Sequence, residues 1–472
     1  MSIRVRSALS TAILLAIVLL LEAYGLRSGT TGIVLVAMVG AIALGVVCFR
    51  VDLRWAGVGA AVAAAFTLTW NGWYVGPLRP GDILVLVSLL CFLLADPNGA
   101  FRTPPWWVKQ LAIVVVLIVA IQIYFPPDPV YLSQRIVLNA TGQPTASTSG
   151  SLLSANLGVA FKFIVAVVAT PMVFTAAALV ERRAVRWLAA AFATGAGVSG
   201  LVALADHFGT DLGRIVTGIP NVGSRQLGFS DHPNFLAAGL TLAAPLAFWL
   251  LPSRSRFERL VGAAALLGCV GGVFASGSRG GAVCIVVVLA ISVLLHERTR
   301  GYAPMIGLAA VLVVGIIIAF VPSVGATLLR VTRLGGGTAT AGSDSVRAIV
   351  GAQGVRDFHH SPISGIGLQV SFDASQVYLQ ELASGGLILF SAVSVYMLGA
   401  IITAFRRMRE PLVAALLAAL LITLALNVFE ADLTDRFYYV PAAILIARVL
   451  TAREDAREHN GVVDEHPALA VT

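Results

Sequence analysis

Long apolar stretches separated by short polar segments run along nearly the whole chain. Fourteen of these stretches are long enough, or nearly so, to cross the hydrocarbon core of a bilayer as a helix. They lie near residues 8–25, 32–49, 55–70, 82–95, 108–125, 157–180, 187–206, 235–251, 260–276, 281–295, 304–321, 385–405, 411–428 and 437–450. The pattern predicts an all-α, polytopic membrane protein with about 14 transmembrane helices.

Basic residues at the ends of the apolar stretches predict the topology. With a cytoplasmic N-terminus and alternating spans, every inside segment carries at least two basic residues, and these segments hold 20 of the 32 in the chain. We therefore expect a multi-pass protein of the inner (cytoplasmic) membrane with both termini cytoplasmic. The long outside segments are near 126–156, 207–234 and 322–384, and the first is rich in Ser, Thr and Gly, as mobile loops are.

The same pattern divides the chain into three regions. N-terminal transmembrane helices are expected over residues 1–206, and a second membrane region over residues 207–452. The second region includes a large extracytoplasmic helical loop at 322–384, between spans 11 and 12. Residues 453–472 are polar and are expected to form a disordered cytoplasmic tail.

Composition excludes several classes of protein. Of the 472 residues, 58% are apolar and 12% are charged, whereas a soluble domain carries about 25% charged residues. The net charge of +8 is explained by membrane topology, so no nucleic-acid partner is expected. The four Cys lie within apolar stretches and lack metal-ligand spacing, so neither a metal site nor a cofactor is predicted.

A polar segment outside the membrane carries the first candidate chemistry. It reads Gly-Phe-Ser-Asp-His-Pro-Asn-Phe at 228–235 and leads into a span. Asp231 and His232 place titratable groups at the membrane surface, and Asn234 is expected to cap the helix that follows. The alternative is a polar turn with a helix cap and no chemistry.

The second candidate is a tight hairpin, Ser-Gly-Ser-Arg-Gly-Gly at 276–281. It holds Arg279 between two spans, where an arginine is costly unless it faces protein, water or an anion. The neighbouring glycines would let a bulky anion approach the backbone, so an anion site is favoured. A snorkelling arginine at a helix end is the alternative.

The third candidate lies in the loop at 322–384. A Ser-Asp pair at 343–344 can cap a helix that runs to about residue 358. One face of this helix carries Arg347, Gly351, Gly354 and Phe358. The glycines are expected to leave open space beside Arg347, whereas Arg356 points the opposite way. The alternative is an amphipathic outer loop without chemistry.

Other charged groups are expected on the outer side of the membrane. Lys162 is the only lysine inside a span, and it either has a function or pairs with an acidic residue of a neighbouring span. The acidic turn at 430–436 either carries a base or neutralises an arginine-rich face. Arg225, Arg279 and Arg347 suit phosphate oxygens, so a lipid with a diphosphate at headgroup level would place its charge among them.

These elements, in this order, resemble the O-antigen ligase and polymerase superfamily of Wzy/WaaL-like membrane glycosyltransferases. The similarity runs from about Gly228 to Leu389 and includes the two motifs above. It continues with Asp344 to Arg347. The last pieces are His-Ser-Pro-Ile-Ser-Gly-Ile-Gly at 360–367 and Tyr-Leu-Gln-Glu-Leu-Ala at 378–383.

The resemblance implies a metal-independent glycosyltransferase whose active site is extracytoplasmic. Such enzymes move a glycan from a polyprenyl-diphosphate carrier to a sugar hydroxyl of a glycan or glycolipid acceptor, on the outer side of the cytoplasmic membrane, in cell-envelope polysaccharide ligation or polymerisation. The lipid bilayer is a further expected partner. The two diphosphate-binding arginines of the family fall on Arg279 and Arg347. The further residues expected to bind substrate are Arg225, Lys162, His232, Asn234 and Gln376.

One departure from the family concerns the general base. The family often has a His-Asn or similar pair where Ser375 and Gln376 stand here, and a neutral serine is a poor proton acceptor. The replacement base is sought among Asp373, His359, His360, Asp231 and Glu430. Asp373 ranks first because it is next to the altered position. With Gln376 it also has the spacing of a capping box for a short helix near 374–383, which would weaken it as a base.

Three other functions stay open. The first is a transporter or flippase for lipid-linked glycans, although the span centres are apolar apart from Lys162. The second is a different class of polyprenyl-phosphate glycosyltransferase, for which Glu22 is the sole acidic candidate near the first outer loop. The third is a catalytically altered family member that only binds glycolipid.

Overall fold

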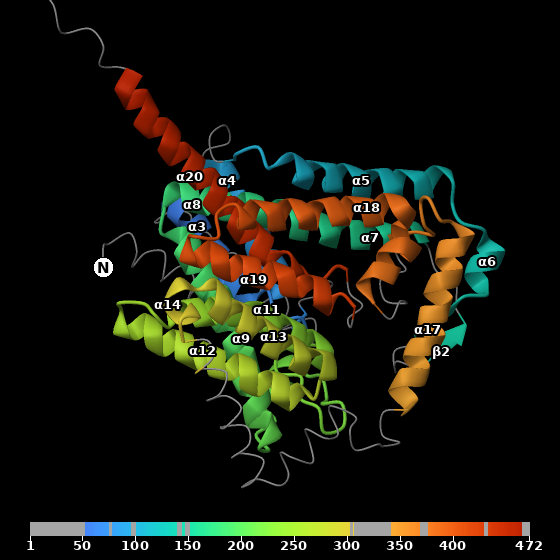
Figure 1. The fold of residues 1–472 in the computed structure, drawn as a ribbon. Helices are drawn as coiled ribbons and strands as arrows, with labels where there is room; N and C mark the ends of the chain where they lie inside the picture. Colours follow the sequence, from blue (N-terminus) through green and yellow to red (C-terminus); the bar gives the residue numbers. More distant parts are fainter. Residues whose placement is uncertain are drawn as a thin grey trace, which may run out of the picture.

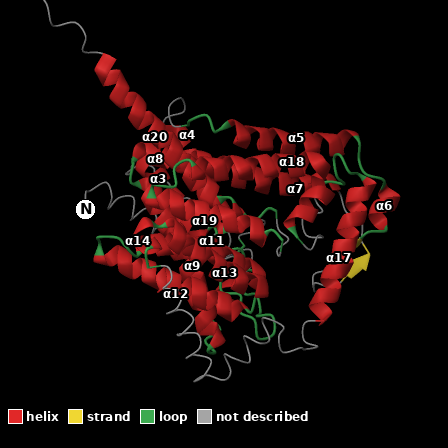
Figure 2. Ribbon diagram, in the orientation of Figure 1, coloured by secondary structure: helices red, strands yellow, loops and turns green. Residues whose placement is uncertain are grey.

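The computed structural model describes residues 52–74, 78–95, 101–138, 144–146, 152–302, 305, 341–368, 376–428 and 433–464. The predicted spans near 8–25 and 32–49 lie outside the described residues, and of the span near 304–321 only Met305 is described. The described part of the chain is almost entirely helical, which confirms the all-α class (Figure 2).

Each of the other eleven predicted spans coincides with a helical segment. These segments are α3 (Leu53–Thr67), α4 (Pro80–Ala95), α5 (Trp106–Tyr124), α7 and α8 (Leu152–Ile164 and Thr170–Val180, joined by the π-helical turn Val165–Ala169), α9 (Ala184–His207), α11 (Pro233–Leu250), α12 (Arg256–Ser276), α13 (Arg279–Leu295), α18 (Val377–Phe405), α19 (Pro411–Leu426) and α20 (Val440–Asp464). Six described segments are long and apolar enough to cross a membrane, and four further apolar helices are shorter. The chain is therefore a multi-pass membrane protein, and the count of fourteen spans stays a prediction.

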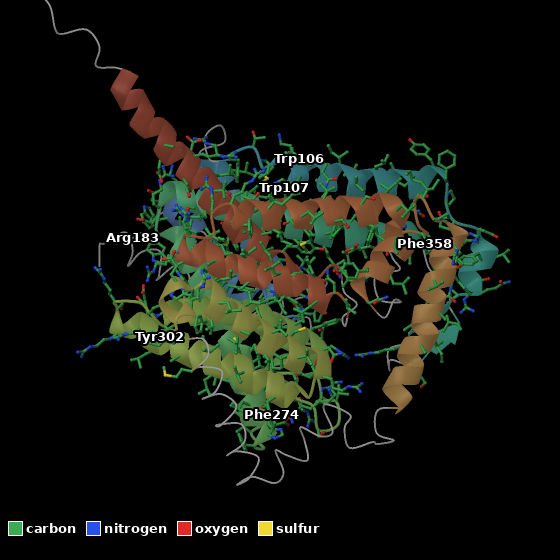
Figure 3. The ribbon with its side chains drawn as sticks, in the orientation of Figure 1. Trp106, Trp107, Arg183, Phe274, Tyr302 and Phe358 are labelled. Carbon is green, nitrogen blue, oxygen red and sulfur yellow. The ribbon has the colours of Figure 1, made fainter. Side chains whose placement is uncertain are left out.

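Helix α5 has the surface that contact with lipid requires. Its side chains Ile113 and Val116 are 65% and 58% exposed, although both are apolar. Trp106 and Trp107 begin the helix at one end of the bundle, where tryptophan favours the membrane–water interface (Figure 3). On the inward side, Trp107 packs edge-to-face against Tyr396 of α18, with ring centroids 5.1 Å apart.

Glycines allow α9 and α12 to touch through their backbones. A Cβ at Gly200 would lie 2.1 Å from the carbonyl oxygen of Gly268, and a Cβ at Gly268 would lie 2.1 Å from that of Gly197. Small residues at a helix contact permit this close approach, which strengthens packing where lipid supplies no hydrophobic driving force. The contact fixes α12, and with it the hairpin at its end.

The smaller elements gather at the ends of the bundle. Helix α6 (Pro129–Ser133) and an antiparallel pair of strands, β1 (Ile136–Leu138) and β2 (Pro144–Ala146), lie at the same end as α17 (Ala341–His360) (Figure 1). The predicted mobile loop at 126–156 therefore contains regular structure. The remaining short elements are α10 (Leu212–Thr217), α14 (Glu297–Arg300) and the 3-10 helix η4 (Arg436–Tyr438).

The predicted disordered tail is partly helical. Helix α20 continues to Asp464, so the prediction is wrong over residues 453–464. The segment begins Arg-Glu-Asp-Ala-Arg-Glu at 453–458, and Arg, Glu and Ala favour helix. Glu454 and Asp455 also accept from arginines of neighbouring segments, at 3.2 Å and 2.9 Å.

Helix α17 confirms the helix predicted in the outer loop, and it packs more closely than expected. It begins at Ala341, so residues 343–344 lie within its first turn and are not its cap. A Cβ at Gly354 would lie 2.9 Å from Cγ of Leu379 in α18. This glycine therefore brings the two helices together and does not leave open space, whereas Arg356 is exposed on the other side as predicted.

A buried ion pair fastens α17 to the segment after α6. Arg135 donates through Nε and Nη2 to the two carboxylate oxygens of Asp357, at 3.0 Å and 2.9 Å. Tyr131 donates to the same carboxylate at 2.8 Å, and its ring stacks on His360 with centroids 3.8 Å apart. Both charges are almost fully buried; breaking such a pair typically costs about 3–5 kcal/mol. The position of α17 is therefore held from its C-terminal half.

Helix α18 is broken at Gly386, and the segment at 361–368 fills the break. Gly386 has φ +62° and ψ −158°, a conformation open essentially only to glycine. The freed N–H groups of Leu387 and Ile388 donate to the carbonyl oxygens of Pro362 and Ile363 at 2.9 Å and 3.2 Å. Irregular backbone at membrane depth needs such partners. The motif at 360–367 therefore supplies the hydrogen-bond acceptors that the broken helix lacks.

Candidate functional site

The turn at residues 228–235 is fixed by two neighbouring helices. Gly228 has φ +54°, and a Cβ there would lie 2.4 Å from the carbonyl oxygen of Ser199 in α9, so the position requires glycine. Phe229 donates its N–H to Oγ of Ser199 at 3.0 Å and packs on Trp70, just after α3, with ring centroids 4.8 Å apart. The polar residues that follow are therefore presented on a rigid backbone.

His232, and not Asn234, caps α11. The helix begins at Pro233, and Nδ1 of His232 accepts the backbone N–H of Asn234 at 3.2 Å. The prediction of an Asn234 cap is wrong because an imidazole lone pair replaces the usual side-chain oxygen. Since Nδ1 is the acceptor, the neutral ring carries its proton on Nε2, where it is a hydrogen-bond donor.

Arg225 joins this turn to the hairpin at 276–281. Its Nε donates to the carbonyl oxygen of Ser276 at 2.9 Å, and its Nη2 donates to Oδ1 of Asn234. The side chain of Asn234 therefore orients a guanidinium group. The structure thus brings together three of the predicted substrate-binding residues: Arg225, His232 and Asn234.

Arg279 lies within this hairpin and is the first residue of α13. Gly277, at φ +60°, ends α12, and Ser278 caps α13 by accepting the N–H of Gly281 at 3.3 Å. A Cβ at Gly281 would lie 2.5 Å from Cβ of Ala237 in α11, so this glycine serves the contact between helices. Arg279 is half-buried three residues beyond the carbonyl group that Arg225 contacts.

Arg347 approaches the same cluster from α17. The pKa of His232 is lowered from 6.5 to about 4, mainly by burial and also by the charges of Arg225 and Arg347, against an opposing effect of Asp231. The charge of Arg347 on α17 therefore affects His232 from a distant segment of the chain. Positive charge from two segments acts on one neutral histidine, which is an arrangement suited to an anion.

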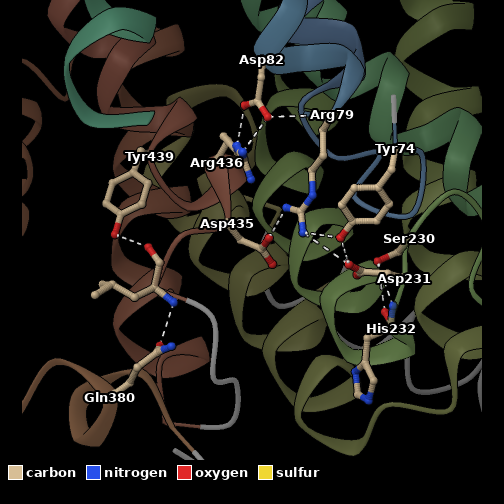
Figure 4. A network of polar contacts seen from close by, with 11 residues as sticks. Tyr74, Arg79, Asp82, Ser230, Asp231, His232, Gln380, Asp435, Arg436 and Tyr439 are labelled. Carbon is tan, nitrogen blue, oxygen red and sulfur yellow. Dashed lines mark hydrogen bonds and ion pairs between the residues drawn. The ribbon is translucent and has the colours of Figure 1, made fainter. Parts of the chain in front are cut away.

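Asp231 is held in position by two donors. The hydroxyl group of Tyr74 donates to Oδ2 of Asp231 at 2.7 Å, and Nη2 of Arg79 donates to the same oxygen at 3.3 Å (Figure 4). The other oxygen, Oδ1, is buried and accepts no hydrogen bond within the described residues. Asp231 therefore keeps one buried carboxylate oxygen next to His232 that has no hydrogen-bond partner among the described residues.

A chain of buried ion pairs extends from Asp231 into the bundle. Arg79 also donates to Oδ1 of Asp435 at 2.6 Å, and Arg436 donates to both oxygens of Asp82 at 2.5 Å (Figure 4). The acidic turn at 430–436 therefore uses Asp435 to balance an arginine. Sequence reasoning missed Tyr74, Arg79 and Asp82, and the only signal was a charged start to the short apolar run near 82–95.

Other predicted site residues lie elsewhere or outside the described residues. His360 stands 13 residues after Arg347 on α17, about 20 Å along the helix, and stacks on Tyr131. Gln376 is itself the N-cap of α18 and makes no side-chain capping bond, so the predicted capping box with Asp373 is wrong. Helix α18 begins at Val377, the residue after this cap, and the N–H of Val377 donates to the carbonyl oxygen of Asn427.

The roles of the remaining candidate residues stay predictions. Asp373, Ser375, Glu430 and Glu22 lie outside the described residues. Lys162 is half-buried on α7, just before the π-helical turn. His359 is exposed next to Phe358, at the C-terminal end of α17 (Figure 3).

The buried histidine predicts a pH-dependent stability. Because the pKa of His232 is about 4 in the fold and about 6.5 when unfolded, the unfolded chain binds the proton first as the pH falls. Stability is therefore complete above about pH 6.5 and decreases toward pH 4. We expect His232→Asn, which can still cap α11, to flatten this part of a curve of Tm against pH in detergent, relative to wild type. An equally steep curve in the variant would contradict the assignment.

Comparison with known proteins places part of the chain in a family. Residues 263–390 match the family model Wzy_C, described as O-antigen ligase. The matched segment includes the end of α12, Arg279, all of α13, α17 with Arg347, and the break in α18. No curated protein matches the chain. The resemblance found in the sequence is therefore confirmed for this segment.

Proposed function

Since residues 263–390 of this chain match the O-antigen ligase family model, we propose that the protein is a membrane glycosyltransferase of cell-envelope polysaccharide assembly. Its donor is a glycan on a polyprenyl-diphosphate carrier, and its acceptor is a sugar hydroxyl of a glycan or glycolipid. The transfer takes place on the outer side of the cytoplasmic membrane.

One observation carries this proposal. Arg225 donates to Asn234 and to the carbonyl oxygen of Ser276, three residues before Arg279. The charges of Arg225 and of Arg347 on α17 also lower the pKa of His232 in this cluster. Guanidinium groups bind phosphate oxygens through two parallel hydrogen bonds, and a neutral Nε2–H adds a further donor. A diphosphate at headgroup level matches the charge and the donors of this cluster.

The proposed reaction is a single displacement. The acceptor hydroxyl oxygen attacks the anomeric carbon of the donor glycan and forms the new glycosidic bond. The bond from that carbon to the diphosphate oxygen breaks, and its electron pair leaves on the carrier diphosphate. The arginines stabilise that growing charge, a role that metal ions have in other transferases.

Asp231 is the proposed base among the described residues. Its buried Oδ1 accepts no hydrogen bond from the described residues, while Tyr74 and Arg79 hold the other oxygen. It would accept the proton of the attacking hydroxyl, since a carboxylate in hydrogen-bond reach is a competent general base. His232 is less suited, because its Nδ1 lone pair is used to cap α11.

Reconstitution tests the proposed function. The purified chain in proteoliposomes is supplied with a polyprenyl-diphosphate-linked oligosaccharide and an acceptor glycan, with EDTA present. We expect an extended acceptor and one free polyprenyl diphosphate per transfer, by mass spectrometry. Movement of the donor across the bilayer without a new glycosidic bond would instead identify a flippase, and donor binding without turnover would identify a non-catalytic relative.

The proposed base makes a separate prediction. Asp231→Asn keeps the size of the side chain and removes its charge, so glycan transfer is expected to fall by about 10²–10⁴-fold. The matched control is Asp211→Asn, because the side chain of Asp211, just before α10, is half-exposed and pairs only with exposed Arg214, at 3.3 Å. Transfer is measured at equal amounts of folded protein. Wild-type rates in Asp231→Asn would move the base to another residue.

A further inference from the structure

A second cluster of arginines surrounds a cavity at the opposite end of the bundle. The cavity has a volume of about 840 Å³, and Arg183, Arg186, Arg254 and Arg409 line it. Arg183 lies at the end of the molecule remote from Phe358 of α17 (Figure 3). Helix α13 runs from Arg279 at one end to the cavity wall at Leu295, about 25 Å apart. This cavity is therefore separate from the candidate active site.

Five elements converge on the cavity. Its wall comes from the starts of α9 and α12, the ends of α11 and α13, and the turn between α18 and α19. Two tryptophans from different helices, Trp187 and Trp249, contribute apolar surface next to the charges. Tryptophan with arginine is the combination found at the headgroup level of a bilayer.

One of the four arginines, Arg186, is already paired with a carboxylate of the cavity wall. Arg186 pairs with Glu258, donating through Nε at 3.1 Å, and its guanidinium carbon lies 5.3 Å from the centroid of the Trp249 ring. These contacts neutralise Glu258 and fix the guanidinium plane against the aromatic surface. Arg186 therefore shapes the cavity, with little charge left for a ligand.

The other three arginines keep their charge for a ligand. Within the described part of the chain, no carboxylate pairs with the side chain of Arg183, Arg254 or Arg409. Glu297 is the one further acidic residue of the wall. The rule that basic residues gather at cytoplasmic helix ends explains why arginines occur at this end. It does not explain why they converge on one cavity with two tryptophans.

We propose that this cavity binds a phosphate group, carried by an anionic phospholipid or present as a free anion. Basic pockets between membrane helices bind anionic headgroups through charge-assisted hydrogen bonds, while the neighbouring aromatic surface accommodates the glycerol region. The ligand connects α9, α11, α12 and the α18–α19 turn, four elements of the helix bundle that carries the candidate active site. Phosphate binding at this cavity does not depend on the proposed transferase activity.

Lipid binding by the full chain tests the proposal. Purified protein in detergent is titrated with phosphatidylglycerol and, separately, with zwitterionic phosphatidylcholine, and bound lipid is counted by native mass spectrometry. We expect the triple variant R183Q/R254Q/R409Q to lose affinity for phosphatidylglycerol at least about tenfold. The control R256Q/R259Q/R406Q removes the same charge from exposed positions at the same end that do not line the cavity.

The outcomes separate the alternatives. Equal losses in both triple variants, or none in the first, would show that general charge attracts the lipid and would overturn the proposal. Displacement of the lipid by millimolar inorganic phosphate supports a site for free phosphate, and persistence of the lipid supports a headgroup site. A second measurement uses the wild-type protein, so it does not depend on the folding of a variant. The protein is crosslinked to a photoreactive phosphatidylglycerol, and label is expected in residues 249–258 or 408–414. Label only elsewhere would also overturn the proposal.

Discussion

Replacement of Arg347 by Gln is expected to reduce glycan transfer by about 10²–10³-fold without unfolding the protein. Arg347 is half-buried on the inward side of α17, and its charge acts on His232 across the cluster. The variant removes a donor aimed at the charge that grows on the leaving diphosphate. The loss is expected in kcat as well as in KM, because that charge is largest in the transition state. Arg279→Gln is expected to behave in the same way.

The same helix supplies the control for Arg347. Arg356 is exposed on the opposite side of α17, and its Nη2 donates to Oε1 of Gln353 at 2.8 Å. Arg356→Gln therefore changes the same charge in the same helix and is expected to transfer glycan at a rate within about twofold of wild type. Transfer is assayed in proteoliposomes at matched protein levels. Wild-type rates in both Arg347→Gln and Arg279→Gln would end the proposed diphosphate site.

Replacement of Gly386 by Ala is expected to destabilise the fold by about 3 kcal/mol or more. The position has φ +62° and ψ −158°, which costs any other residue conformational energy. An added Cβ would also lie 2.3 Å from the carbonyl carbon of Ile363. Gly365→Ala meets the same two penalties against Ser384, at 2.3 Å. Both variants therefore force apart the broken helix and the segment that fills the break.

Two other glycines separate the causes of this effect. Gly209 has φ +97° with nothing within 4 Å of an added Cβ, so Gly209→Ala reports backbone strain alone. Gly158 has an ordinary φ and open space, so Gly158→Ala is expected to be neutral or slightly stabilising. Tm and the recovery of folded protein in detergent are compared across the four variants. If Gly386→Ala and Gly209→Ala had the same Tm, the close contact of Gly386 with Ile363 would not contribute to the destabilisation.

Hydropathy and charge predicted the parts of the fold that depend on local composition. The eleven apolar runs in described regions coincide with helical segments, because a helix is the only way for such a run to satisfy its backbone in lipid. The helix around Arg347 and the opposed direction of Arg356 also follow from periodicity alone. The resemblance supplied the family, which residues 263–390 confirm.

The sequence predicted less of the site, because its contacts join distant segments. Asp231 owes its position to Tyr74 and Arg79, more than 150 residues earlier, and no local pattern reveals such pairing. The motif at 360–367 resembles part of a catalytic family, yet in the structure Gly365 packs on the backbone of Ser384 and Ile363 packs on Gly386. Asparagine is a common cap residue, which predicts Asn234 as the cap of α11. In the structure His232 is the cap, and burial keeps its imidazole neutral.

The pairing of Asp82 with Arg436 has a consequence for biosynthesis. The two residues are 354 positions apart, so at ordinary translation rates about 20–70 s separate their emergence from the ribosome. During that interval the carboxylate at the start of α4 lacks its bidentate guanidinium partner. The ion pair that joins α4 to the C-terminal part of the protein therefore forms only after that part has been inserted, and the early helices are incompletely assembled until then.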